Sequence, residues 1–210
     1  RVNFDNSKIK GSINLNGAVI DDLTLEEFRE TLDPTSDLIE FLNPLGSDNA
    51  YYLDTGWVSS DSTIELPNSS SIWIADKNTI GVNEPVKLTW TSDQNITFEK
   101  IITLDENYLF SVDQRVINNS GLSFDLYPYG LSKRQGIPEM QNFFILHEGP
   151  LSITDGVLEE YDYDDLKDDK KIKHSSVGGW IGMTDKYWQT AIIPNQNEPV
   201  QQTYSYSFVD

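Results

Sequence analysis

The chain has 210 residues and a formal net charge of −19, and 38% of its residues are hydrophobic and 11% aromatic. This length suits one large domain with a sizeable core, and many aromatic residues with little alanine favour strands over helices. The charge argues against binding to nucleic acid or to an anionic lipid surface, and the lack of cysteine excludes disulfides and thiolate metal sites.

The first element predicted in chain order is a hairpin between Ile13 and Ile20. Asn16-Gly17 lies between two short apolar runs, and both residue types tolerate the positive φ of a type I′ turn. This dipeptide is the strongest short-range hairpin signal in the chain.

The segment that follows the hairpin is ambiguous. Thr24 and Glu27 have the spacing of a helix capping box, and the apolar residues after Thr24 recur at helical intervals. Residues 20–25 fit equally well a single strand that runs into a polar loop. Asp33-Pro34 ends either version, because a proline disfavours helical backbone in the residue before it. The apolar residues at helical spacing are Leu25, Phe28 and Leu32.

Short strand candidates, separated by clusters of turn-forming residues, fill most of the chain beyond this point. Such a series is typical of a β-sandwich or barrel. The candidates are 38–42, 50–57, 71–75, 85–91, 96–104, 108–117, 122–129, 142–146 and 151–154. The residues expected to share one face are Val86, Leu88 and Trp90 in one candidate, and Phe110, Val112 and Val116 in another.

An acidic block occupies residues 159–169, and a Lys- and Ser-rich stretch follows it. A block of like charges repels itself, so we predict a solvated loop here, with a second polar loop around His174. Residues 177–183, 186–193 and 203–209 read as the last strands, and Pro194 closes the second of these. Because the chain shows no repeat and no long linker, we expect a single domain over residues 1–210.

The sequence predicts no catalytic residue, no cofactor and no metal. The acidic block lacks the residue order of a calcium-binding EF-hand loop. His147 with Glu148 would be the simplest acid–base pair, but His147 reads as a strand end and His174 as a loop residue, so both are interpreted as ordinary histidines. There is no G-x-S-x-G, and Gly178-Gly179 lies within an aromatic, strand-like stretch rather than before a helix, as a phosphate-binding loop would require.

A stretch near the C-terminal end resembles one in the YidC periplasmic domain, where Gly-Gly-Trp is followed by Lys or Gln, Tyr, an aromatic residue and a closing Ile-Pro. Shorter pieces at 11–23, 51–57, 127–138 and 143–149 resemble the same family and lie in the same order. The early segments suggest an α-proteobacterial member. The family-motif residues in this chain are Gly178, Gly179, Trp180, Lys186, Tyr187, Trp188 and Pro194.

The resemblance implies a β-supersandwich related to the galactose mutarotase fold. It implies a periplasmic domain of a multi-pass inner-membrane protein, a membrane protein insertase and chaperone that works alone or with the Sec translocon. Its implied partners are client membrane proteins and the Sec accessory subunits SecD and SecF. We expect this chain to be a fragment of that longer protein and not itself membrane-embedded, since no apolar run approaches the roughly 20 residues of a spanning helix.

Two main functions remain open at this stage, beside a weaker third in which the domain is a purely structural spacer. The first is an accessory, non-enzymatic binding domain of an insertase, and the second is a sugar-binding or mutarotase-like module on the same fold. A mutarotase needs a Glu base and a His acid in one cleft, and no such motif is visible. For the family motif we expect a structural role, in which the glycines allow a bulge or a close backbone approach and the aromatic residues fill a core or cleft.

Overall fold

The computed structural model describes residues 1–138, 146–185, 187–198 and 200–209. This part of the chain is mostly β-strand with one short helix, so the expected all-β class is confirmed at the level of a predominantly β protein. It divides into two compact units, unit 1 from Arg1 to Gln135 and unit 2 from Gly136 to Asp210, each described by itself below. That the 210 residues form a single domain stays a prediction.

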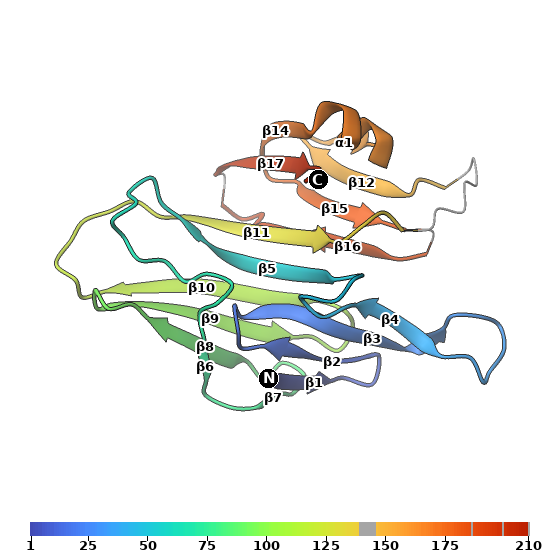
Figure 1. Cartoon of the computed structure of the whole chain (residues 1–210), viewed down its shortest axis with the longest axis horizontal. Helices are drawn as coiled ribbons and strands as arrows, with labels where there is room; N and C mark the ends of the chain where they lie inside the picture. The colour runs from blue at the N-terminus through green and yellow to red at the C-terminus, as the bar shows by residue number, and fades with distance from the viewer. Residues whose placement is uncertain (139–145, 186, 199, 210) are drawn as a thin grey trace. The chain divides into compact units, whose positions relative to one another are not determined.

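Unit 1 contains two sheets (Figure 1). One has the strand order β11-β5-β3-β2-β1-β7, with β4 also paired to β3, and the other has the order β10-β9-β8-β6. The pairings are antiparallel except for the parallel pair of β1 with β7. The strand bounds are Val2–Asp5 (β1), Ile9–Asn14 (β2), Val19–Arg29 (β3), Leu38–Leu42 (β4), Tyr51–Val58 (β5), Ile74–Ala75 (β6), Thr79–Ile80 (β7), Val86–Thr91 (β8), Ile96–Leu104 (β9), Phe110–Asn118 (β10) and Tyr127–Arg134 (β11).

The core of unit 1 lies between these two sheets. The ring of Trp57 in β5 lies 5.1 Å from that of Phe98 in β9, and Phe4 in β1 lies 5.1 Å from Phe110 in β10. Both pairs join opposite sheets, and their tilted or edge-on geometry is the one that aromatic rings prefer. The alternation expected for 85–91 is confirmed, since Val86 and Leu88 are fully buried.

The hairpin expected at Asn16-Gly17 is confirmed, because β2 and β3 pair with Ile13 opposite Ile20. The turn differs from the prediction. Positive φ occurs at Gly17 and Ala18, and Asn16 keeps a negative φ. The last paired residues are Asn14 and Val19, so the connection is longer than a two-residue turn. Asn16 also forms a β-bridge to Ile72, which joins the connection to a neighbouring segment.

The helical alternative for the segment after this hairpin is wrong. β3 runs through Thr24 and Glu27 to Arg29 as one strand, with Leu23 and Leu25 buried at alternate positions. The segment forms a strand rather than a helix because pairing with β2 and β4 buries the apolar residues that alternate along one face of it.

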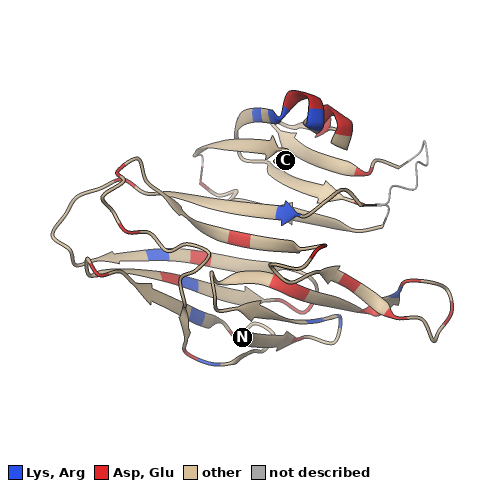
Figure 2. Cartoon of the chain, viewed as in Figure 1, with Lys and Arg blue, Asp and Glu red and all other residues tan. Residues whose placement is uncertain are grey.

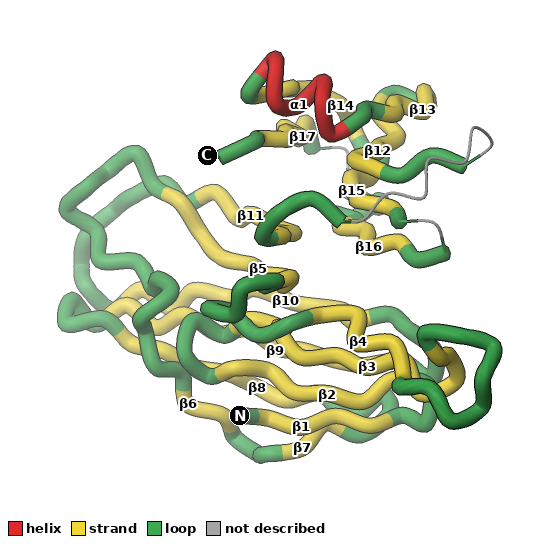
Figure 3. Tube along the Cα trace, turned by 45° about the vertical axis from the view of Figure 1, so that its right-hand side comes forward, coloured by secondary structure: helices red, strands yellow, loops and turns green. Residues whose placement is uncertain are grey.

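Unit 2 contains a four-stranded sheet with the order β13-β12-β15-β16 and a two-stranded sheet of β14 and β17. Figure 3 shows the helix α1 beside these strands. No helix among the described residues is long and apolar enough to cross a membrane. The bounds are Gly149–Thr154 (β12), Val157–Glu160 (β13), Tyr163–Asp169 (α1), Lys171–Val177 (β14), Trp180–Thr184 (β15), Gln189–Ile192 (β16) and Gln201–Ser207 (β17).

The solvated loop predicted for the acidic block is wrong. The block holds the end of β13 and the helix α1, whose Tyr163 and Leu166 are buried. The carboxylate of Asp165 accepts a hydrogen bond of 3.0 Å from the Asp162 backbone N–H, as in a capping box. Acidic side chains in the first turn also suit the positive end of the helix dipole, which offsets part of their mutual repulsion.

Several other strand boundaries also differ from those predicted. The polar stretch around His174 is the strand β14, whose inward residues alternate with exposed Lys and Ser. The strand expected over 177–183 is in fact the end of β14 and the start of β15, separated by Gly178-Gly179. The candidate at 122–129 is displaced toward the C-terminus as β11, and the candidate at 142–146 lies almost wholly outside the described residues.

Lys170, which joins α1 to β14, has a φ of +58°, a conformation that costs a residue with a side chain about 1 kcal/mol or more. We expect Lys170→Gly to stabilise the chain by about 0.5–1 kcal/mol, even after losing the contact of the ammonium group with the Phe208 ring. Urea unfolding of the variant and the parent measures this difference. Lys173→Gly, in an exposed position of β14, is the control and should destabilise the chain. Equal loss in both variants would contradict the prediction.

Candidate functional site: the Gly-Gly-Trp segment and the buried polar groups

Gly178 and Gly179 form the turn between β14 and β15, and their φ values are +76° and +88°. A Cβ on Gly179 would lie 2.0 Å from the carbonyl oxygen of Ile153 in β12, whereas a Cβ on Gly178 would meet only the Gln196 side chain, at 3.2 Å. Gly179 therefore meets two requirements that glycine alone satisfies, a left-handed backbone and a close approach to a neighbouring strand.

The turn is held by two side chains that sequence reasoning did not single out. The Gln196 amide donates hydrogen bonds to the carbonyl oxygens of Gly179 (2.9 Å) and Pro194 (2.7 Å), and its oxygen accepts one from the Gly179 N–H (3.1 Å). The hydroxyl of the buried Tyr204 donates to the Gly178 carbonyl oxygen at 2.8 Å. No sequence signal could have found Gln196, which lies in a polar segment between two strands.

The aromatic residues of the motif are less buried than expected. Trp180 is half-buried and lies opposite Ile153 in the pairing of β15 with β12. Trp188 is half-buried, and Tyr187 is 71% exposed, so Tyr187 does not fill a core. Lys186 lies outside the described residues. The segment from Trp180 to Pro194 is thus mainly the β15–β16 hairpin with its flanks.

The partial burial of Trp180 lowers the cost expected for its removal. Truncation of a fully buried tryptophan to alanine lowers the free energy of unfolding by about 3–5 kcal/mol. For the half-buried Trp180 we expect Trp180→Ala to lower it by about 1.5–3 kcal/mol. Trp73 in unit 1 is 2% exposed and serves as the matched comparison, with the full cost expected for Trp73→Ala. Denaturant unfolding of both variants measures the two values. A larger loss for Trp180→Ala than for Trp73→Ala would show that Trp180 is covered in solution.

The two histidines have separate structural partners. His147 lies within hydrogen-bond distance of the Pro150 carbonyl oxygen, at 3.1 Å from Nε2. Nε2 of His174 lies 2.7 Å from the Tyr161 hydroxyl, and that hydroxyl lies 3.5 Å from a carboxylate oxygen of Glu159. His174 is therefore linked to a carboxylate through a tyrosine, rather than facing one across a cleft as an acid–base pair would. Among the described residues, no three His, Asp or Glu side chains gather as metal ligands.

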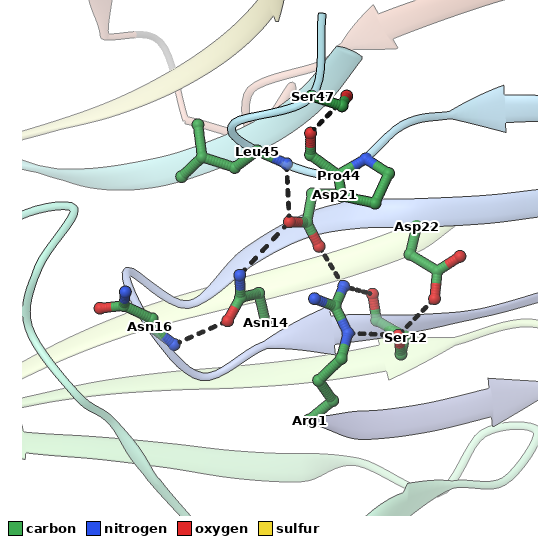
Figure 4. A network of polar contacts seen from close by, with 9 residues as sticks. All are labelled: Arg1, Ser12, Asn14, Asn16, Asp21, Asp22, Pro44, Leu45 and Ser47. Atoms are coloured by element: carbon green, nitrogen blue, oxygen red, sulfur yellow. Dashed lines mark hydrogen bonds and ion pairs between the residues drawn. The ribbon is translucent and has the colours of Figure 1, made fainter. Parts of the chain in front are cut away.

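Asp21 is a fully buried carboxylate in unit 1 that joins three chain segments (Figure 4). It forms an ion pair with Arg1 and accepts hydrogen bonds from the Asn14 side-chain amide (3.4 Å) and the Leu45 N–H (3.0 Å). These partners come from the start of the chain, from β2 and from the loop after β4. A buried charge needs such partners, so the Asp21 group is structural.

Lys100 is a second buried charge and lies on the core face of β9, 1% exposed. Its ammonium group donates to the Ala18 carbonyl oxygen (3.1 Å) and to the Asp54 carboxylate (3.4 Å), and it lies 5.1 Å from the centre of the Trp73 ring. The other Asp54 oxygen accepts a 3.0 Å hydrogen bond from the Tyr129 hydroxyl. The Lys100–Asp54–Tyr129 chain therefore links the two sheets of unit 1.

Burial of these groups changes their proton affinity. Desolvation lowers the pKa of Lys100, although Asp54 opposes the shift. Desolvation, together with the nearby Asp54 carboxylate, raises the pKa of Tyr129. In unit 2, burial raises the pKa of Tyr206 to about 12.

The Lys100 pKa predicts a pH dependence with a definite sign. The folded chain holds the Lys100 proton less tightly than the unfolded chain, so unfolding takes up a proton at pH values between the lowered pKa of the folded chain and the ordinary lysine pKa of 10.5. The contribution of Lys100 to the free energy of unfolding therefore rises with pH up to that value. We expect the free energy of unfolding of the parent to increase relative to that of Lys100→Met when the pH is raised from about 8 to about 10, just below the ordinary lysine pKa. Urea unfolding measures this difference. A relative loss would contradict this. Above about pH 10 the raised tyrosine pKa values act in the opposite direction, because the unfolded tyrosines lose their protons first.

Comparison with known proteins gives one consistent result. The sequence matches the family described as the YidC periplasmic domain over residues 1–209. A "Membrane protein insertase YidC" from Pelagibacter ubique is 41% identical and covers 98% of this chain and 37% of its own length. One from Granulibacter bethesdensis is 41% identical over 93% of this chain and 35% of its own, and one from Rickettsia bellii is 38% identical over 99% and 37%. The chain thus spans little more than a third of the length of these α-proteobacterial relatives.

Proposed function

Because this chain belongs to the YidC periplasmic domain family, we propose that it serves as the periplasmic part of a membrane protein insertase and acts by binding rather than by catalysis. The observation that carries this proposal is a match over nearly the whole chain, both to the family and to relatives named as insertases. We assign the insertion activity itself to a longer protein of the kind that these relatives represent, since the chain spans about a third of their length.

We further propose that the complete domain is a β-supersandwich related to the galactose mutarotase fold. The predominance of antiparallel sheets supports this, and so do the two sheets of unit 1 with a shared aromatic core. Such sandwiches offer sheet faces and edges to partners without any need for catalytic groups.

The proposed ligands are extended or partly unfolded segments of client membrane proteins, and the Sec accessory subunits SecD and SecF. Acidic residues are spread over strands and loops of both units, with few basic residues among them (Figure 2). This surface favours basic segments, and added salt should weaken the contact. Clients must be released after folding, so we expect dissociation constants of about 1 μM to 1 mM.

The test is crosslinking in cells from photoreactive residues placed across the domain in the full-length insertase, combined with titration of the 210-residue chain. We expect defined client proteins or Sec subunits to be trapped, and salt-sensitive binding in the titration. If no position traps either partner and the domain can be deleted without an insertion defect, the domain is a spacer and the proposal fails.

The sugar-active alternative finds little support. Each histidine bonds a structural partner, and a hollow of about 480 Å³ on unit 1, lined in part by Lys10 and Asp22, contains neither of them. Polarimetry with the anomers of glucose and galactose should show no rate above that of buffer. An acceleration that disappears in His174→Ala would favour the alternative.

A further inference from the structure

The hairpin of β3 and β4 carries a projecting segment, residues 26–39, which we call the β3–β4 arm. In Figures 1 and 3 its loop extends beyond the other strands of unit 1. The register between the two strands shifts between Leu25 and Arg29, so the arm departs from regular pairing at that point. Its base is fixed to the body of unit 1, because the Glu26 N–H donates to the Lys8 carbonyl oxygen (2.8 Å) and the Tyr108 hydroxyl donates to Glu27 (3.1 Å).

The tip of the arm is ordered by its own hydrogen bonds. The Asp33 carboxylate accepts bonds from the backbone (2.8 Å) and the hydroxyl (2.7 Å) of Thr35, and the Ser36 hydroxyl donates to the Asp33 carbonyl oxygen (2.8 Å). The Arg29 guanidinium donates to the Ser36 carbonyl oxygen across the hairpin. These hydrogen bonds between polar groups of the tip hold its shape.

The tip of the arm also carries an exposed apolar side chain. Leu32, at the tip, is 105% exposed, the highest value among the large hydrophobic residues that the structure describes, and Phe28 is 40% exposed. Single exposed apolar residues are common on protein surfaces, but this leucine is held in place at the end of a projection, where a polar residue would be better solvated. Its position suits insertion into an apolar recess of another molecule.

The charge of the arm defines the kind of molecule that can approach it. The arm has five acidic residues and one basic residue, hence a net charge of −4, and the basic residue is already bonded to Ser36. An anionic membrane surface or an acidic protein would be repelled, and a cationic segment would be attracted. The acidic residues are Glu26, Glu27, Glu30, Asp33 and Asp37.

We propose that the β3–β4 arm is a docking surface for a basic segment of a partner protein, with Leu32 as its apolar contact and the surrounding carboxylates as its charged contacts. The inference rests on the proposed function, since it assigns the binding of basic client or Sec segments to one part of the domain. It goes beyond that function in naming the place and the residue that contributes most.

The experiment titrates a fluorescein-labelled peptide of alternating lysine and leucine into the 210-residue chain and into two variants of the arm. Leu32→Ser leaves the charge unchanged, and we expect it to weaken binding about tenfold, as for the loss of one buried leucine. The double variant Glu30→Gln/Asp37→Asn removes two exposed carboxylates, and we expect it to weaken binding about threefold and to reduce the salt dependence.

Matched controls separate the arm from the rest of the surface. Leu122→Ser removes another exposed leucine, 50% exposed in a loop, and Asp48→Asn/Asp125→Asn removes the same charge elsewhere. Both should bind within about twofold of the parent, since distant sites act independently. Thermal unfolding of every variant confirms that each is folded. Vesicles of phosphatidylglycerol should not bind the parent.

The outcomes distinguish failure of the docking site on the arm from failure of the proposed binding function. If the peptide binds the parent and Leu32→Ser equally, the assignment to the arm is wrong while the binding function stands. If the peptide does not bind the parent at all, the docking proposal is wrong, and the proposed function is decided by the crosslinking experiment described above. Vesicle binding that depends on Leu32 would make the arm a membrane contact and would also overturn the proposal.

Discussion

Asp54→Ala should lower the free energy of unfolding by about 3–5 kcal/mol, the usual cost of leaving a buried charge without its partner. Asp54 is the carboxylate that the Lys100 ammonium group contacts at 3.4 Å, and the Lys100 side chain is only 2% exposed. The substitution also removes the acceptor of the Tyr129 hydroxyl. The remaining partners of Lys100, a carbonyl oxygen and an aromatic ring, do not neutralise its charge.

A second substitution at the same site tests this cause. Lys100→Met removes the charge and keeps the length of the side chain, but it leaves the Asp54 carboxylate, whose side chain is 19% exposed, with the Tyr129 hydroxyl as its printed partner. We therefore expect a smaller loss than for Asp54→Ala, about 1–2 kcal/mol. In the double variant Lys100→Met/Asp54→Ala most of the loss should be recovered, because no charge is left buried. A purely steric role of Asp54 would instead give additive losses.

The pH dependence of Asp54→Ala provides an independent readout. Unpaired Lys100 can leave the charged state by losing its proton, which costs less as the pH approaches the ordinary lysine pKa of 10.5. The deficit of Asp54→Ala relative to the parent should therefore shrink as the pH is raised from neutral toward that value. Urea unfolding at the two ends of this range measures it, and a constant deficit would contradict an uncompensated charge as the cause.

The burial of Lys100 could be predicted from the sequence, but its charged partner could not. The strand expected at 96–104 is β9, and its alternate residues Ile96, Phe98, Ile102 and Leu104 are all buried. The period of two that predicts this strand places Lys100 on the same face. The buried lysine was therefore predictable in position, whereas its partner Asp54 comes from a strand with which β9 does not pair.

The acidic block illustrates a competing local signal. Mutual repulsion predicts a loop, but Tyr163 and Leu166 lie three residues apart and bury one face of α1. The capping interaction of Asp165 with Asp162 has the same spacing and was equally visible in the sequence. The spacing of the buried and capping residues therefore decides the structure here, and the charge density does not.

The Gly-Gly-Trp segment could be predicted only in part. A close backbone approach was expected at the glycine pair, and Gly179 shows one. The partner atom belongs to Ile153, in a strand that lies far from the glycine in the sequence, so pattern alone could not identify it. The same holds for Gln196, whose hydrogen bonds depend on the path of the chain after Pro194.

Gly179→Ala should destabilise the chain by about 3–5 kcal/mol. A left-handed backbone costs an alanine about 1–2 kcal/mol, and forcing a methyl group toward the Ile153 carbonyl oxygen, 2.0 Å away, adds the cost of shifting a paired strand. The Gly179 N–H and carbonyl groups would also lose their geometry with Gln196. Gly178→Ala is the matched control, because only a flexible side chain lies near its Cβ, and about 1–2 kcal/mol is expected.

Thermal unfolding of the two alanine variants decides between the causes. If positive φ alone mattered, both substitutions would cost the same, since the two glycines have similar φ values. A cost for Gly179→Ala well above that for Gly178→Ala assigns the difference to the contact with Ile153.

The same thermal unfolding experiments also test whether the chain is a single domain. In one cooperative domain, Gly179→Ala in unit 2 and Asp54→Ala in unit 1 lower a single transition, whereas independently folding units would leave one transition unchanged in each variant.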